Sequence, residues 1–544
     1  MKKHFLRFSV AVFSFFLFSV SVRAQTGVYA ITGATVITAS GPNLSNATVV
    51  IRDGLIESVG RDAKVPADAK VFDGKGLTVY PGFFDANTNL GIPKTTAPQQ
   101  PNRGSQADQS NSNYPPELRA EEKAFEKLKA GESQFKARRD NGFTTVLTVS
   151  EEGIFQGHST VINLAGDSVA EMIIKPVFAQ HVSFRTARNG VFPTSLMGTF
   201  AALRQMFLDA GRLEEVEKMY ADNPVGMKRP EKDLSLEALI PVVKGQMPVV
   251  FTANSEREII RVLDLIGEFN LRGIIAGGQE SYKVIDRLKT AKVPVLLSLD
   301  LPVRTAAENK EAEPESMEVL RRRIEAPKNA AKLKQAGVKF AFQSGEMKNI
   351  TDFLKNAEIV TKNGLSKQDA IRAMTIEAAE ILGVSRQLGS IEKGKIANLV
   401  VMNGDIFAAN RRITHVFVDG KLFEQPKKDD KKKTAGTGGA NAKPLNVAGT
   451  WAITVEAPGQ TIPLTFTFNQ QGENLSGTIN SSMFGVAPIR NGSVSASGFS
   501  FDTTVTFAGQ ELDISFNGRV TGNQVEGTAD TQQGPAAFSG TKNP

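Results

Sequence analysis

The feature that most constrains this chain is an apolar run that ends in polar residues, at positions 80–90. It reads Tyr-Pro-Gly-Phe-Phe-Asp-Ala-Asn-Thr-Asn-Leu, and its apolar first half is typical of a buried strand. Residues two apart on a strand share a face, so we expect Asn87 and Asn89 to point together beyond the strand end. The stretch therefore predicts a core strand that carries two neutral amides at its mouth.

Further along the chain, apolar strand-like runs alternate with helical patterns. This alternation is typical of βα units and a parallel sheet. Seven strands can be placed in this way, and we expect the eighth in the weakly patterned region between residues 182 and 239. The strands after the first are expected at 144–149, 173–182, 248–253, 273–278, 293–299 and 338–342. Helices are expected at 116–139, 196–219, 256–269, 317–335 and 366–382.

Short strands with turn signals flank the alternating region on both sides. Neither group is large enough to close a core alone, so we expect the two groups to pair with each other. On the N-terminal side the strands lie at 29–38, 47–52, 55–60 and 71–79, with an Asp-Gly turn at 53–54. On the C-terminal side they lie at 396–402 and 413–418, with a second Asp-Gly turn at 419–420.

Two motifs resemble those of the amidohydrolase superfamily. The opening strand is similar to the family pattern Pro-Gly-Phe-Ile-Asp-x-His-x-His. Residues 389–401, Gly-Ser-Ile-Glu-Lys-Gly-Lys-Ile-Ala-Asn-Leu-Val-Val, are similar to its closing Gly-Ser-Ile-x-x-Gly-Lys-x-Ala-Asp-Leu-Val. The resemblance is to imidazolonepropionase-like members and covers residues 31–423. It implies an α/β fold, a distorted (β/α)8 TIM barrel beside a composite β-sandwich made from both ends of the catalytic region.

The resemblance also implies hydrolysis of a non-peptide carbon–nitrogen bond. In the family, one or two divalent metal ions generate the attacking hydroxide, and an aspartate acts as proton shuttle. At each position that aligns with a metal ligand or with the catalytic aspartate of the family, this chain carries a different residue type. In chain order the replacements are Asn87, Asn89, Thr252, Gln279 and Gly345. If the last two alignments slip by one or two residues, Glu280 or Glu346 becomes an available carboxylate.

Histidine is scarce in this chain. Of four histidines, one lies in the first 24 residues, which leaves His158, His181 and His415. A catalytic zinc takes about three protein ligands, usually dominated by histidine. We expect His415 to be structural because it lies in the flanking strands. A rearranged zinc site built from His158, His181 and Glu280 or Glu346 stays open as an alternative to two ordinary loop or core histidines.

The first 24 residues have the pattern of a secretory signal peptide, with a basic start, an apolar run at 8–22 and Val-Arg-Ala before Gln25. We expect export to the bacterial periplasm or exterior, with no stable membrane anchor after cleavage; an uncleaved anchor is the alternative. The chain contains no cysteine, which excludes disulfides and a lipoprotein lipid. Four of its seven net positive charges lie in this segment, which argues against a nucleic-acid partner.

Composition changes again near residue 447, after a Lys-Asp cluster and a Gly-rich stretch at 427–443. Alternating short strands then predict an antiparallel β-barrel or sandwich. Its opening Gly-Thr-Trp is similar to the start of lipocalin-like barrels, with Trp451 either plugging one end or lining a calyx. The expected parts are a signal peptide (1–24), the composite β-sandwich (25–80 and 391–424), the barrel (81–390), a linker (425–446) and the C-terminal β-domain (447–544). We also expect a loop at 97–113 at the barrel mouth.

Other enzyme classes lack their motifs here, with no phosphate-binding loop and no Gly-x-Ser-x-Gly in context. We therefore expect a catalytically impaired amidohydrolase-fold protein without a cofactor. It would bind a small polar ligand, or act as a non-catalytic subunit, in a homo-oligomer or beside an intact relative. The alternatives are an active enzyme with the rearranged zinc site, and a surface or glycan binder that uses the C-terminal β-domain.

Overall fold

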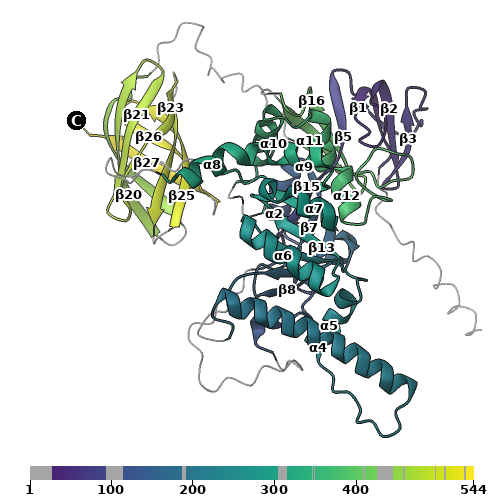
Figure 1. Cartoon of the computed structure of the whole chain (residues 1–544). Helices are drawn as coiled ribbons and strands as arrows, with labels where there is room; N and C mark the ends of the chain where they lie inside the picture. The colour runs from purple at the N-terminus through teal and green to yellow at the C-terminus, as the bar shows by residue number, and fades with distance from the viewer. Residues whose placement is uncertain are drawn as a thin grey trace, which may run out of the picture. The chain divides into compact units, whose positions relative to one another are not determined.

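The computed structural model describes residues 27–93, 114–186, 192–303, 315–345, 347, 349–408, 411–425, 445–457, 460–495, 498–507, 510–531 and 534–543. The chain divides into two compact units, Met1–Gln425 and Pro426–Pro544, each described here by itself (Figure 1). No helix within the described ranges is long and apolar enough to cross a membrane. The expected signal peptide, the 97–113 loop and nearly all of the linker lie outside these ranges.

Strands from both ends of the first unit form one eight-stranded sheet, in the order β18-β17-β16-β5-β1-β2-β3, with β4 beside β1 (Figure 1). Val79 on β5 pairs with Val401 on β16, which confirms the predicted union of distant segments. The two Asp-Gly turns pack together, and a side chain at Gly420 would meet the Cα of Gly54 at 2.6 Å. The strands are β1 (Tyr29–Val36), β2 (Leu44–Arg52), β3 (Leu55–Gly60), β4 (Lys70–Asp73), β5 (Leu77–Pro81), β16 (Leu399–Asn403), β17 (Arg412–Val418) and β18 (Lys421–Glu424).

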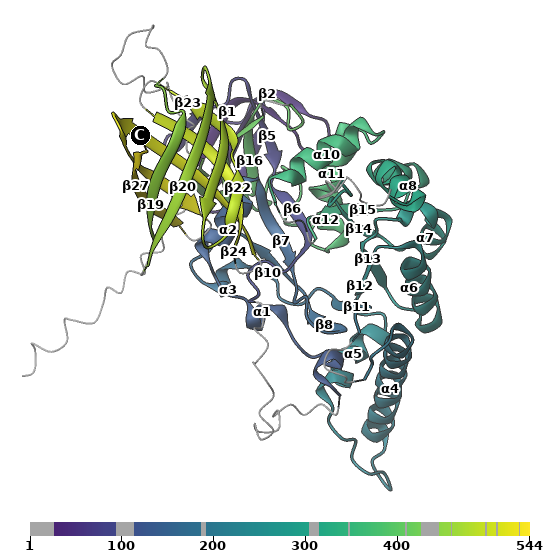
Figure 2. The same ribbon diagram turned by 90° about the vertical axis from the view of Figure 1, so that its left-hand side faces the viewer.

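The barrel contains seven parallel strands in two groups (Figure 2). β6 pairs with β7, and β11 to β15 pair in sequence order. Six lie where the sequence predicts them, and the distorted TIM barrel is confirmed. The seventh, β11, covers only the end of the strand predicted at 173–182, because residues 173–175 form a separate strand. The seven strands are β6 (Phe83–Thr88), β7 (Phe143–Thr148), β11 (Gln180–Ser183), β12 (Val249–Ala253), β13 (Gly273–Gly277), β14 (Val295–Ser298) and β15 (Phe340–Gln343).

The eighth barrel strand does not lie where the sequence predicts it, between residues 182 and 239. The described residues between 182 and 239 contain no further strand and form helices α4 (Leu196–Asp222) and α5 (Leu234–Val243). The gap between β7 and β11 is filled instead by β8 (Phe155–His158) and β9 (Thr160–Asn163), which run antiparallel to β11 and β7 respectively. A short β10 (Ile173–Lys175) pairs with the outer edge of β9. The sequence suggests only parallel strands, so it gives no signal for this reversed segment.

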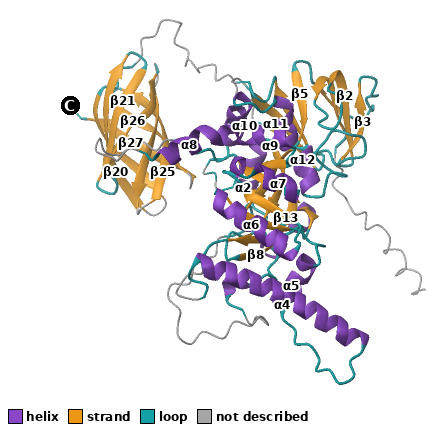
Figure 3. Cartoon of the chain, viewed as in Figure 1, coloured by secondary structure: helices purple, strands orange, loops and turns teal. Residues whose placement is uncertain are grey.

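Helices cover the outside of the barrel strands (Figures 2 and 3). Ser255 and Glu258 form a complete capping box at the start of α6, which fixes where this helix begins. Three predicted helices are each divided into shorter ones. The α-helices are α1 (Ala124–Lys127), α2 (Glu132–Asp140), α3 (Val169–Met172), α4 (Leu196–Asp222), α5 (Leu234–Val243), α6 (Glu256–Phe269), α7 (Ile285–Ala291), α8 (Met317–Glu325), α9 (Asn329–Ala336), α10 (Asp352–Lys362), α11 (Lys367–Ala373) and α12 (Ile376–Ile381).

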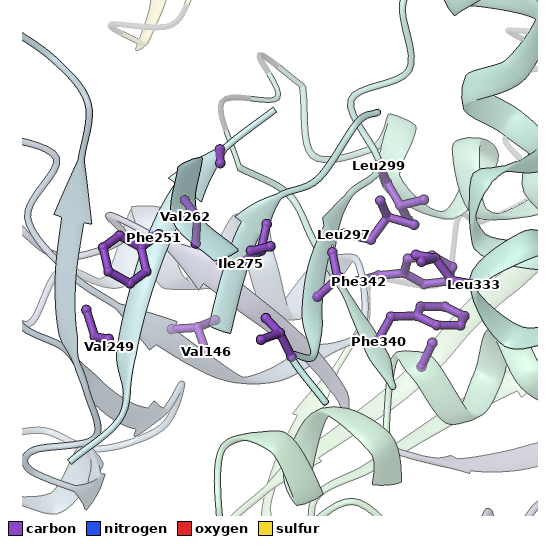
Figure 4. Packing of buried hydrophobic residues seen from close by; sticks show 14 of the residues in the cluster. Val146, Val249, Phe251, Val262, Ile275, Leu297, Leu299, Leu333, Phe340 and Phe342 are labelled. Atoms are coloured by element: carbon purple, nitrogen blue, oxygen red, sulfur yellow. The ribbon is translucent and has the colours of Figure 1, made fainter. Parts of the chain in front are cut away.

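Side chains alternate along the barrel strands between two apolar layers. One row faces the surrounding helices, as Figure 4 shows for Phe251, Ile275 and Phe342. The other row faces the barrel interior, where Val250, Leu296 and their neighbours pack with residues of α12. Both rows are buried, which explains why these strands read as continuous apolar runs.

The second unit is a closed antiparallel barrel of eight strands, because β20 pairs with both β19 and β21, and β22 is an additional strand on β21 (Figure 3). Its interior is packed with aromatic rings around Phe466, including Phe501 and Phe516 at 5.2 and 5.1 Å between ring centroids. Trp451 is buried and donates to the Val447 carbonyl at 2.9 Å. The strands are β19 (Gly449–Ala457), β20 (Gln460–Gln471), β21 (Asn474–Ser481), β22 (Gly485–Pro488), β23 (Arg490–Val494), β24 (Gly498–Phe507), β25 (Gln510–Thr521), β26 (Gln524–Thr531) and β27 (Gly534–Lys542).

Candidate functional site

A pocket of about 100 Å³ lies at the carboxyl ends of the barrel strands. We name it the mouth pocket. Active sites of barrels of this architecture lie at this face, because the strand ends and following loops converge there. Its lining comes from strands throughout the barrel: Asn87, Thr88, Val149, Ser150, Glu151, Gln156, Ser183, Arg185, Thr252, Asn254, Ala276, Gly277, Gln279, Ser298, Asp300, Gln343 and Gly345.

The polar lining follows from the pattern along each strand. On each strand, the side chains that face the barrel interior are apolar near the bottom of the barrel. The next inward-facing side chain, two residues further along, is polar and lies at the carboxyl end of the strand. These pairs are Val250 and Thr252, Leu296 and Ser298, and Ala341 and Gln343. The last polar residue of each inward row therefore enters the mouth pocket.

Two residues that line the mouth pocket each carry a buried amide oxygen with no hydrogen-bond donor among the described residues: Oε1 of Gln343 and Oδ1 of Asn87. Gln343 is only 2% exposed, and its Nε2 donates to the Leu296 carbonyl at 2.7 Å. That bond fixes the amide so that its oxygen remains the unpaired atom. Buried polar atoms in folded proteins nearly always have a partner, so these acceptors mark a place for a donor.

Among the described residues, three charged side chains line the mouth pocket: Glu151, Arg185 and Asp300. Arg185 donates to the Glu151 backbone carbonyl at 3.3 Å, and Gln279 donates to the Asp300 carbonyl at 3.4 Å. Two carboxylates and one guanidinium make the lining acidic by one formal charge.

Below the mouth pocket, Asp85 is fully buried and holds the end of β15 in place. Its Oδ1 accepts from the Ser344 amide at 2.8 Å, and its Oδ2 accepts from the Ser344 hydroxyl at 2.5 Å and from Arg138 at 3.1 Å. Burial raises the pKa of Asp85, although the Arg138 charge and the Ser344 hydrogen bonds act in the opposite direction. These contacts give Asp85 a structural role.

The structure brings most of the predicted pocket residues together and separates others. Asn87, Thr252, Gln279 and Gly345 all line the mouth pocket. Asn89 does not, because β6 ends at Thr88 and its pairing with β7 shifts between Asp85 and Thr88. The expected shared face of Asn87 and Asn89 is thereby lost at the strand end.

The remaining candidate carboxylates do not supply the pocket. Glu280 is 6% exposed, and its carboxylate accepts from the Glu256 amide at 2.9 Å and pairs with Lys283 at 3.1 Å. It therefore stabilises the start of α6 and does not face the mouth pocket. Glu346 lies outside the described residues.

The two histidines of the rearranged-site alternative point to opposite faces. His181 pairs in register with Val250 and so faces the barrel interior, where burial lowers its pKa to about 3. His158 pairs with Gln180 and faces outward, close to the backbone of Ala238 on α5. Burial lowers the pKa of His158 as well. Neither lines the mouth pocket, so the two histidines are not placed to share an ion there.

The donors of the mouth pocket do not fit a catalytic divalent metal. Zinc takes about three protein ligands, mostly imidazole or thiolate, and the lining contains only amides, hydroxyls and the two carboxylates. Within the described part of the chain, no three residues of the types His, Cys, Asp and Glu cluster in a way that could hold a metal ion.

Several pocket residues were not identified from the sequence, notably Gln156, Ser183, Asn254, Ser298 and Gln343. Four of the five share one position in the fold. Ser183, Ser298 and Gln343 are the last residues of their strands, and Asn254 directly follows its strand. Reading every strand end for polar residues finds these. Gln156 was not found from the sequence because its strand, β8, was not predicted.

Comparison with known proteins agrees with this architecture. Residues 235–423 match the sequence profile of the amidohydrolase family. The structure is similar to that of an amidohydrolase from Thermotoga maritima, with 24% identity, a TM-score of 0.60, and coverage of 73% of this chain and 100% of the other. A putative prolidase from Bifidobacterium longum matches with 19% identity, a TM-score of 0.44, and coverage of 74% and 96%. No sequence among the curated proteins matches the chain.

Proposed function

Because the chain is a member of the amidohydrolase superfamily, we propose that it uses the family barrel to bind a small polar ligand in the mouth pocket. In this proposal the chain performs no metal-dependent hydrolysis. It is exported to the periplasm or exterior, and it acts alone, as a homo-oligomer, or as a non-catalytic subunit beside an intact amidohydrolase.

One observation carries the proposal: the mouth pocket has the position of a barrel active site, but its lining consists of neutral amides, hydroxyls and glycine at the aligned ligand positions. Thr252 and Gln279 lack a strong metal donor, and Gly345 has no side chain at all. An amide or hydroxyl hydrogen-bonds well to a polar organic group and binds zinc poorly. The lining therefore favours an organic ligand over a catalytic ion.

Support also comes from the hydrogen bonds that hold one wall of the pocket. Asp85 holds Ser344 by two hydrogen bonds, and Ser344 directly precedes Gly345 in the pocket wall. A pocket wall that is already held in place favours binding, because less ordering is needed when the ligand arrives.

The test is a binding screen with purified mature protein, with and without a chelator. The probes have about three to five non-hydrogen atoms and comprise an ammonium, an amide, a carboxylate and a polyol. At least one of them is expected to bind with about millimolar affinity. Binding is expected to be unchanged by the chelator. Chelator-sensitive hydrolysis of cyclic amides or acyl dipeptides contradicts the proposal, and so does the absence of binding by every probe.

A further inference from the structure

Two hydrogen-bond acceptors on residues that line the mouth pocket lack a donor among the described residues. Oε1 of Gln343 and Oδ1 of Asn87 are buried without a donor among the described residues. Three donors of the lining are used within the protein: Gln343 donates to the Leu296 carbonyl, Ser183 to the Gly153 carbonyl at 2.8 Å, and Gln279 to the Asp300 carbonyl. A ligand that brings N–H groups satisfies these acceptors, whereas a ligand that brings only acceptors leaves them unsatisfied.

The charges of the lining favour the same kind of ligand. Among the described residues of the lining, Glu151 and Asp300 carry two negative charges and Arg185 carries one positive charge. Arg185 is exposed, and it donates to the Glu151 backbone carbonyl. Complementary charge favours a cationic group over an anionic one.

We propose that the mouth pocket recognises its ligand through nitrogen-bound hydrogens and that a primary ammonium group is the preferred head group. This proposal rests on the proposed function and specifies the ligand class. The Gln343 and Asn87 oxygens accept from the ammonium, and the carboxylates of Glu151 and Asp300 supply the favourable field. A pocket of about 100 Å³ holds a head group the size of about three waters. Any larger part of the ligand extends toward solvent.

The experiment compares three probes of similar size: ethylammonium, acetamide and acetate. Binding to the mature protein is followed by saturation-transfer NMR and by thermal unfolding. Ethylammonium has three non-hydrogen atoms, so its dissociation constant is expected to be about 1 mM at best. Acetamide is expected to bind about tenfold more weakly because it has no charge, and acetate is expected not to bind.

Two variants connect binding to the proposed contacts. Gln343→Met keeps the length of the side chain and removes the acceptor, and Asp300→Asn removes one carboxylate from an exposed position. Each is expected to weaken ethylammonium binding about tenfold. The matched control is Asp264→Asn, which removes an exposed carboxylate of α6 outside the pocket and is expected to leave binding unchanged. If Gln343→Met does not fold, Asp300→Asn still provides the test.

The outcomes separate this inference from the proposed function. Acetate or a polyol binding while ethylammonium does not overturns the inference and leaves the binding function standing. Acetamide binding as tightly as ethylammonium overturns the preference for a charged group. Equal loss in Asp300→Asn and Asp264→Asn shows a nonspecific charge effect and overturns the placement of the ligand. No binding by any probe overturns both proposals.

Discussion

The Asp85 carboxylate and the Ser344 hydroxyl lie 2.5 Å apart although the two residues are 259 positions apart in the chain. Asp85 belongs to the first barrel strand, and Ser344 follows the last. Among the described strands no hydrogen-bonded ladder joins β6 to β15. The Asp85–Ser344 contact therefore links the two barrel edges at the place where backbone pairing is missing.

Replacing Asp85 is expected to destabilise the first unit strongly. Asp85→Ala leaves the buried Ser344 amide without its acceptor and Arg138 without its ion-pair partner. Breaking a buried pair in this way costs about 3 to 5 kcal/mol, which is measurable by urea unfolding. The matched control is Glu231→Gln, which breaks the exposed Lys228–Glu231 pair and is expected to change stability by less than about 0.5 kcal/mol. Equal effects in the two variants would show that Asp85 does not link the edges.

Asp419 is expected to make the stability of the first unit depend on pH. Burial raises its pKa from 3.8 to about 6, and its Oδ2 is buried with no partner among the described residues. Because the folded state holds the proton more tightly than the unfolded chain, this contribution to stability is present below pH 4 and is lost as pH rises through about 6.

Asp419→Asn removes the unfavourable charge and keeps an oxygen that accepts from Asn163. At neutral pH the variant is expected to be more stable than the parent by about 3 kcal/mol, with the difference disappearing below about pH 4. Urea unfolding at several pH values measures this. Asp53→Asn at the other Asp-Gly turn is the control, since Asp53 is exposed and shares the positive φ. A difference that does not vary with pH would contradict the account.

The second unit is expected to depend on its aromatic interior. Phe466→Ala removes a fully buried ring that contacts Phe501 and Phe516. Such a truncation costs about 3 to 5 kcal/mol, seen as a lower unfolding midpoint of this unit alone. Val486→Ala is the control because Val486 is 67% exposed. Similar losses in both variants would mean that the interior is not close-packed.

Restoring only the first-strand histidines is not expected to restore a zinc site. Asn87→His with Asn89→His adds two imidazoles, but position 89 does not line the mouth pocket, and Thr252 and Gly345 supply no further strong donor. Competition with a zinc-binding dye is expected to show the same affinity for the double variant and the parent. Stoichiometric zinc in the double variant would reveal ligands that the proposed site lacks.

The sequence predicts the large-scale fold well because its signals are repeated and independent. Seven strand runs and two terminal motifs agree on a barrel with a composite sheet. The reversed strand at β8 and β9 escapes prediction because each segment spans only four residues and neither alternates clearly. The direction of such a short buried strand is decided by its tertiary neighbours.

The candidate site is predictable only in part. Asn87, Thr252 and Gln279 are found because they replace expected ligands at strand ends. Asn89 is misplaced because a register shift in β6 cannot be read from alternation alone. Glu280 looks like an available carboxylate in the sequence, but in the fold it accepts from the Glu256 amide and pairs with Lys283.

The most direct test of the central claim is the metal content of the mature protein, purified without chelators beside an intact amidohydrolase as a positive control. The account predicts less than about a tenth of an equivalent of zinc, manganese or iron, because the mouth pocket lacks about three strong donors. About one equivalent of tightly held metal, with hydrolysis of a cyclic amide that a chelator abolishes, would contradict it.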